Sequence, residues 1–221
     1  MMKIDKATFD FLRQLKANND REWFQANRAS YEDALSNVKD FITSLIQELA
    51  RFDPHISTDI QAAKCLFRIY RDTRFSKDKT PYKTWFAAGI SLDGRKLEGP
   101  EYYIHLEPGK NFLAAGYWRP GKLHLDQIRQ EIDYNFPALQ QALEQGGWTT
   151  ADLSTEDKLK RPPAGYSEDD PHIDILKLKS FILYQAFDDA ALTHTQGIQH
   201  LVETAKRIHP FKNFIHQSLD Q

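Results

Sequence analysis

Residues 64–83 read KCLFRIYRDTRFSKDKTPYK, and their pattern decides how the rest of the chain is interpreted. The first part of this stretch alternates apolar and mixed side chains with a period of two, which predicts a β-strand. The predicted apolar side holds Cys65, Phe67 and Ile69, and the mixed side holds Leu66, Arg68 and Tyr70. Polar residues and Pro81 interrupt regular structure afterwards, so we expect residues 73–84 to form a loop.

The same stretch is strongly basic, although the chain as a whole is not. Seven basic residues oppose two aspartates, a local charge of +5, whereas the whole chain carries −2. Guanidinium groups bind phosphate and carboxylate through paired hydrogen bonds, and lysines add mobile charges. We therefore expect an anionic small molecule to bind at residues 68–83. The predicted ligand contacts are Arg68, Tyr70, Arg71, Arg74, Lys77, Lys79, Tyr82 and Lys83.

Ion pairing offers a second interpretation of these charges. The three arginines of the stretch would pair with acidic residues from the rest of the chain, which carries −7, and the lysines would only solvate a loop. The sequence leaves both interpretations open.

The motif RIYRDTRFSKDKTPYKT resembles the hallmark of an uncharacterised family of microbial and fungal proteins, a conserved domain of unknown function. Further resembling segments are FLRQLKANNDREWFQANRASY, YYIHLEPG at 102–109, GYWRP at 116–120, LKRPPAGY and LKLKSF. The resemblance runs from Phe9 to Phe214 and implies one intact domain without an established activity. It assigns no role to any residue.

Length and composition indicate one soluble globular domain over residues 1–221. A chain of 221 residues with 41% hydrophobic residues is large enough for one substantial core, and two small domains are the less favoured alternative. No apolar run approaches the roughly 20 residues that a membrane helix needs, so we expect no membrane partner and a cytoplasmic protein. The single cysteine, Cys65, agrees with a reducing compartment and is interpreted as a small core residue.

The order of helical and strand patterns predicts an α+β fold with a mainly antiparallel sheet, covered by N- and C-terminal helices. Residues 5–50 are predicted helical, 64–118 form the sheet, and 122–219 are helical again apart from a last buried strand at 181–183. The remaining strands are predicted at 85–92, 101–107 and 111–118. Asp20 and Asp170 are predicted to cap helices.

Period two also selects the catalytic candidates, His105 and Glu107, because both fall on the mixed side of the strand at 101–107. If that side coincides with the one carrying Arg68, the imidazole and carboxylate would look onto the same cavity as an acid–base pair, with Glu107 orienting or charging His105. Gly116 in the next strand leaves room above the backbone for a group to approach. Alternatively, His105 and Glu107 lie on an ordinary solvated face of the sheet and have no catalytic role.

A second basic segment, Lys158 to Arg161, precedes Pro162-Pro163. It is interpreted either as a lid that closes over an anionic ligand or as a solvated, rigid linker.

Absent motifs narrow the function. The chain has no phosphate-binding Gly-x-x-x-x-Gly-Lys loop, dinucleotide-binding Gly-x-Gly-x-x-Gly, Gly-x-Ser-x-Gly elbow or HExxH, and we expect neither cofactor nor metal.

Two hypotheses for the function remain. One hypothesis is a ligand-binding or enzymatic domain, in the second case a hydrolase or transferase. The other is a non-catalytic module that binds an acidic protein or, weakly, nucleic acid, with Phe75, Tyr82 and Trp85 stacking on bases. A pI near 6.4 counts against a dedicated nucleic-acid binder. The sequence indicates no oligomeric state.

Overall fold

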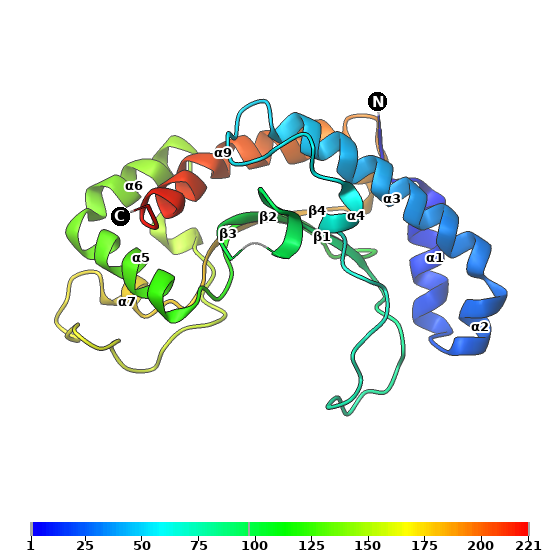
Figure 1. Cartoon of the computed structure of the whole chain (residues 1–221), viewed down its shortest axis with the longest axis horizontal. Coiled ribbons are helices and arrows are strands. Elements are labelled where there is room, and N and C mark those ends of the chain that lie inside the picture. The colour runs from blue at the N-terminus through cyan, green and yellow to red at the C-terminus, as the bar shows by residue number, and fades with distance from the viewer. Residues whose placement is uncertain (1, 97, 221) are drawn as a thin grey trace. The chain divides into compact units, whose positions relative to one another are not determined.

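A computed structural model describes residues 2–96 and 98–220 and contains a four-stranded antiparallel sheet in the order β1-β2-β3-β4 (Figure 1). The strands are β1 (Phe86–Ile90), β2 (Glu101–Leu106), β3 (Asn111–Tyr117) and β4 (Phe181–Phe187). Short connections join β1 to β2 and β2 to β3, whereas β4 pairs beside β3 after a connection of residues 118–180 that contains helices. The predicted α+β class is confirmed.

Helices precede and follow the first three strands. Before them come α1 (Lys6–Ala17), α2 (Arg21–Ala26), α3 (Arg28–Leu49) and the single turn α4 (Ala62–Cys65). After them come α5 (Lys122–Tyr134), α6 (Phe136–Gln145), α7 (Ile173–Leu176), α8 (Asp189–Thr193) and α9 (Gly197–Gln217). Two 3-10 turns, Gly94–Lys96 and Thr150–Asp152, lie in the connections. In the part of the chain that the structure describes, no helix is long and apolar enough to cross a membrane.

The backbone groups into two compact units. The first unit comprises Met1–Lys96, Tyr103–Leu113 and Ala186–Glu203, and the second comprises Leu97–Tyr102, Ala114–Gln185 and Thr204–Gln221. Strands β2, β3 and β4 contribute residues to both units. One domain over the whole chain stays a prediction.

The core of the first unit follows from helical periodicity. Helix α1 and helix α3 each bury one apolar stripe, and α3 packs against α1 and β1. The buried side chains include Phe9, Leu12 and Leu15 of α1 and Val38, Ile42 and Leu45 of α3. Asp20 caps α2 as predicted, because its carboxylate accepts a hydrogen bond of 2.8 Å from the Trp23 backbone N–H.

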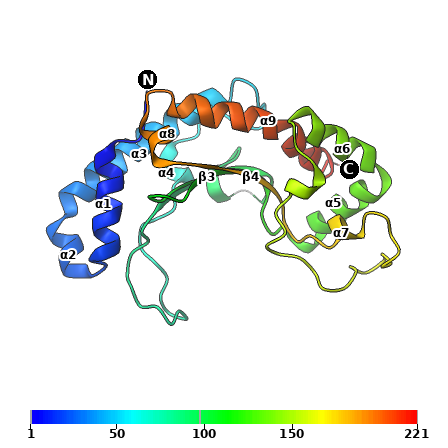
Figure 2. The same ribbon diagram turned by 180° about the vertical axis from the view of Figure 1, so that it is seen from behind.

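The strand predicted at the start of residues 64–83 is wrong. The chain leaves α4 at Cys65 and then makes isolated antiparallel bridges, Leu66 to Ala88 in β1 and Tyr70 to Tyr82. Residues 66–71 therefore pair partly with the returning chain, and residues 66–85 form an arm that extends from β1 (Figures 1 and 2). Period two correctly indicates an extended backbone, but Pro81 offers no N–H to continue a ladder.

Strand β2 alternates as predicted. Tyr102, Ile104 and Leu106 are fully buried, whereas the side chains between them are partly exposed. The room predicted above Gly116 in β3 is filled by β4. A Cβ at Gly116 would lie 2.0 Å from the Phe181 carbonyl oxygen, and its φ of +129° also favours glycine.

Two boundaries in the second unit differ from expectation. Strand β4 confirms the strand predicted at 181–183 but is longer, and by pairing beside β3 it extends the sheet beyond the predicted residues 64–118. The Asp170 carboxylate accepts a hydrogen bond from the His172 backbone N–H at 2.8 Å, and α7 begins only at Ile173. Asp170 therefore stabilises a turn before the helix instead of capping it.

Candidate functional site

Two of the predicted anion-binding arginines form ion pairs inside the arm. Arg71 contacts the Asp78 carboxylate and the Thr80 hydroxyl, and Arg74 pairs with Asp72 at 2.7 Å. The Thr80 backbone N–H, followed by Arg71, lowers the pKa of Asp78 to about 2. The partners come from the arm itself and not from the acidic remainder of the chain.

The tip of the arm is exposed to solvent. The Phe75 side chain is 95% exposed, and the Arg74 guanidinium lies 5.9 Å from its ring centroid. The Lys79 ammonium donates to the Thr73 carbonyl oxygen at 2.9 Å, and Lys77 is exposed. The tip is thus a solvent-exposed surface with cationic side chains and one aromatic ring.

Three other cations converge at the base of the arm, and we call Arg68, Lys83 and Arg95 the cation cluster. The Lys83 ammonium donates to the Arg68 carbonyl oxygen at 2.7 Å and lies 4.9 Å from the Trp85 ring. Both Lys83 and Arg95 also face Phe67, at 5.8 and 5.5 Å from its centroid. No described carboxylate lies within ion-pair distance of these three side chains.

The cations of this cluster repel one another. Burial lowers the pKa of Lys83, and the charges of Arg68 and Arg95 lower it further. Each of these effects disfavours the ammonium form of Lys83. A negatively charged ligand beside Lys83 would reverse the effect of the two arginines.

A cavity of about 440 Å³ adjoins the cluster through Lys83. Its lining comprises Asn19, Arg71, Asp72, Asp78, Thr80, Tyr82, Lys83, Thr84 and Trp85. Asn19 fixes the arm against the turn before α2, because its amide accepts from the Tyr82 N–H at 3.1 Å and donates to the Tyr82 carbonyl oxygen at 2.9 Å. The volume lies within the range of small-molecule sites.

His105 and Glu107 are neighbours, as predicted. Nε2 of the imidazole lies 3.4 Å from Glu107 Oε2, and Nδ1 lies 3.2 Å from the Tyr103 hydroxyl. Burial lowers the pKa of His105, an effect that Glu107 opposes and Lys110 adds to. The imidazole is therefore neutral near pH 7, and both of its nitrogens already have partners.

Trp85 connects the two halves of the predicted site. Its ring lies 4.9 Å from the Lys83 ammonium on one hand and 4.9 Å from the His105 ring centroid on the other. The charge of Arg68 shifts the pKa values of Lys83 and Asp72. The charges that shift the pKa of His105 are those of Glu107 and Lys110. Among the described residues, the lining of the 440 Å³ cavity includes neither Arg68 nor His105.

The two predicted tyrosine contacts have packing roles. The Tyr82 ring is buried and stacks on Phe24, with centroids 4.0 Å apart and planes inclined by 13°. Tyr70 is about half exposed and packs against Tyr82 with centroids 5.4 Å apart. Both side chains hold the arm against α2, although Tyr82 also reaches the cavity.

Several site residues were not predicted. Arg95 follows the Asp93-Gly94 turn and joins the cluster only through folding, so no local signal identifies it. The period-two pattern predicts Phe67 on the apolar side, yet its ring contacts two cations. Lys16 of α1 lies 3.7 Å from Glu107. Over the described ranges, no group of three or more His, Cys, Asp and Glu side chains is arranged to hold a metal ion.

Comparison with known proteins identifies a family but no activity. No curated protein and no solved structure matches the chain. One family model, described as "Conserved hypothetical protein (DUF2461)", matches residues 7–214. This match spans nearly the whole chain and confirms the resemblance inferred from the central motif, so the chain belongs to the conserved hypothetical family DUF2461, whose function is unknown.

Proposed function

We propose that the first unit binds a small molecule carrying a phosphate or carboxylate group at the cation cluster and in the adjoining 440 Å³ cavity. The observation that carries this proposal is the convergence of Arg68, Lys83 and Arg95 without a carboxylate partner among the described residues. A bound anion would relieve their repulsion and accept charge-assisted hydrogen bonds. Phe67 and Trp85 supply an apolar wall for the rest of the ligand.

Lys83 is the central contact of the proposed site. To bind a ligand, Arg74 would have to break its ion pair with Asp72, and Arg71 its ion pair with Asp78. Lys83 would break only one hydrogen bond to a carbonyl oxygen. Ligand binding therefore costs less at Lys83 than at either arginine.

A reaction, hydrolysis or group transfer, is a further step of the proposal. His105 would act as the base and Glu107 would hold its Nε2 proton, so the Nδ1 atom would face the substrate. The substrate must then displace the Tyr103 hydroxyl, which lies 3.2 Å from Nδ1. Binding requires no such displacement, and for this reason it is the part of the function that we propose first.

Calorimetric titration with inorganic phosphate, pyrophosphate and citrate tests the proposal. Lys83→Gln should weaken binding by roughly 10–100-fold, the equivalent of a charge-assisted hydrogen bond of about 1.5–3 kcal/mol. Lys77→Gln is the matched control, since it removes the same charge from an exposed position of the same arm. Equal affinities of the two variants would show that any binding is non-specific.

The exposed tip favours one second candidate, a weak site for single-stranded nucleic acid. Phe75 is almost fully exposed beside Arg74, and a ring next to cations is suited to base stacking and phosphate contact. Fluorescence anisotropy with a labelled oligonucleotide should then show binding that weakens in salt and that Phe75→Ala reduces about tenfold. An unchanged affinity in Phe75→Ala would reject this candidate while leaving the small-ligand site untouched.

A further inference from the structure

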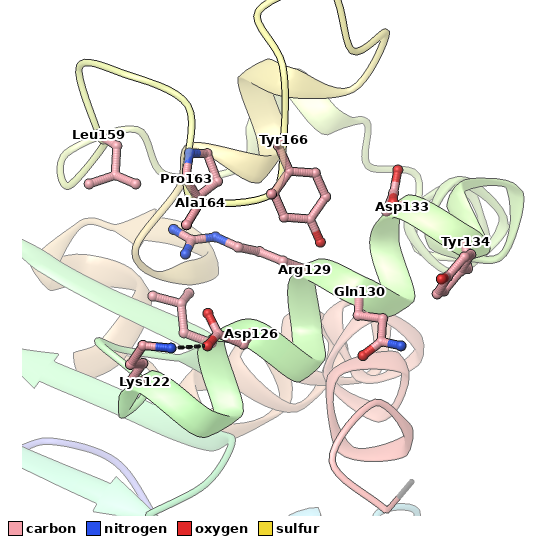
Figure 3. Close-up of a pocket in the computed structure, with 12 residues that line it drawn as sticks. Lys122, Asp126, Arg129, Gln130, Asp133, Tyr134, Leu159, Pro163, Ala164 and Tyr166 are labelled. Carbon is pink, nitrogen blue, oxygen red and sulfur yellow. Dashed lines mark hydrogen bonds and ion pairs between the residues drawn. The ribbon is translucent and has the colours of Figure 1, made fainter.

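The second unit contains a larger cavity of about 770 Å³ between α5 and the segment that includes residues 159–166 (Figure 3). Lys122, Leu125, Asp126, Arg129, Gln130, Asp133 and Tyr134 of α5 line one side of it. Leu159 and residues 163–166 line the other. The wall combines apolar and aromatic surface with charged groups, which is typical of sites for small molecules.

Arg129 is the buried charge of this cavity. The residue is 5% exposed, and its guanidinium donates from Nε to the Leu176 carbonyl oxygen at 2.8 Å and from Nη2 to the Leu178 carbonyl oxygen at 3.1 Å. Nη1 takes no part in these bonds. In Figure 3 the guanidinium extends along the cavity below Pro163 and Ala164. The two carbonyl contacts fix its position but are neutral. Burial lowers the pKa of Arg129 and the charge of Asp126 opposes this, but Asp126 forms its ion pair with Lys122 and not with Arg129.

Asp133 is the complementary charge. It lies four residues after Arg129, a spacing that places both on one face of α5, and both line the cavity. Nevertheless, neither forms an ion pair with the other or with any other described side chain. Lys122 and Asp126 pair with each other at 2.6 Å and so neutralise themselves. One cation and one carboxylate that form no ion pair with a described side chain therefore remain for a ligand.

Tyr166 lies within reach of both charges. Burial raises the pKa of its hydroxyl, Asp133 raises it further, and Arg129 opposes the rise. Figure 3 shows the hydroxyl directed towards α5. The Tyr166 hydroxyl can both donate and accept hydrogen bonds. It lies where a dipolar ligand that bridges Arg129 and Asp133 would bind.

We propose that this cavity binds a small zwitterion, of which a free α-amino acid is the simplest example. Its carboxylate would accept from Arg129 Nη1, its ammonium group would pair with Asp133, and the Tyr166 hydroxyl would contact the polar end. The apolar wall formed by Leu125, Leu159 and the proline-containing segment accommodates the ligand's side chain. This site shares no residue with the proposed anion site.

Ligands that differ by one charged group test the charge requirement. Alanine, leucine and tyrosine are titrated into the full chain by calorimetry, together with propionate, which lacks the amine, and ethylamine, which lacks the carboxylate. At least one amino acid should bind at least tenfold more tightly than both analogues. Saturation by none of the amino acids, or an affinity for propionate or ethylamine equal to that for the tightest-binding amino acid, would overturn the proposal.

Asp133→Asn tests the ammonium contact at an exposed position that leaves the Arg129 anchors intact. It should weaken amino-acid binding at least tenfold without changing the affinity for propionate. Glu144→Gln, at an exposed position of α6 outside the cavity, is the matched control and should bind as the parent does. Equal amino-acid affinity in Asp133→Asn and Glu144→Gln would refute the assignment. Phosphate binding at Lys83 is read in the same samples, so a failure of either site is distinguishable from a failure of the other.

Discussion

Replacing Glu101 by glutamine should stabilise the protein, and the effect should depend on pH. Glu101 begins β2, and burial alone raises the pKa of its carboxyl from 4.5 to about 7. A carboxyl group with a raised folded-state pKa binds a proton more tightly in the folded than in the unfolded chain. Its contribution is therefore favourable below the unfolded pKa and is lost as pH rises from about 4.5 through 7.

The pKa rise sets the size of this effect. A difference of one pKa unit is about 1.36 kcal/mol, so ionised Glu101 lowers the free energy of unfolding by at most about 3 kcal/mol. Water entering beside the ionised group reduces that value, and we expect Glu101→Gln to gain about 1–3 kcal/mol at about pH 8. At about pH 4.5 both side chains are neutral in the folded protein, and the gain should fall to nearly zero.

Urea denaturation across this pH range measures the difference directly. Glu98→Gln serves as the control, because it removes a carboxylate from an exposed position three residues earlier. A stability difference between the parent and Glu101→Gln that is the same at every pH would refute the burial argument.

Two further predictions concern the sheet. Burial lowers the folded-state pKa of His105 below 6.5, so the unfolded chain takes up its proton first and the free energy of unfolding should fall as pH drops through about 6.5. Because Glu107 raises this pKa, Glu107→Gln should lower it further in an NMR titration of His105, and an unmoved titration curve would contradict the contact. Gly116→Ala should lower the free energy of unfolding by about 3 kcal/mol or more, because its Cβ would meet a backbone oxygen of β4 at a positive φ. Gly121→Ala is the control in the same urea assay and should change the free energy of unfolding little, because no atom lies within 4 Å of its added Cβ. Equal losses in the two variants would be evidence against the close approach of β4.

Local patterns predict the regular elements of this protein well. Each helix or strand buries one face, and the periodicity of apolar residues predicts which face that is. This holds for the apolar stripes of α1 and α3 and for the alternation in β2. The stretch 65–70 was misassigned because an extended backbone has the same period whether it pairs with a sheet or with its own returning chain. Likewise, the aspartate signal of Asp170 serves a turn as well as a helix cap.

The chemistry of the arm was less accessible to sequence reasoning. A charge count gives +5 for residues 64–83 but cannot say which cations are paired. Asp72 and Asp78 neutralise Arg74 and Arg71 locally, so these predicted contacts are the least available. Arg95 enters the cluster from a turn beyond β1, and only the folded chain brings it to Phe67 beside Lys83.

Two carboxylates of the first unit, Asp189 and Glu107, form bonds away from the cation cluster. Asp189 accepts from the Gly109 backbone N–H and the Asn111 amide, both at 2.8 Å, and from the Arg13 guanidinium at 2.6 Å. Glu107 is shared between His105 and Lys16. Asn111 is buried, so withdrawing the Asp189 carboxylate would leave the Asn111 amide donor without this acceptor. The proposed binding of an external anion at the cation cluster therefore requires no rearrangement of these bonds.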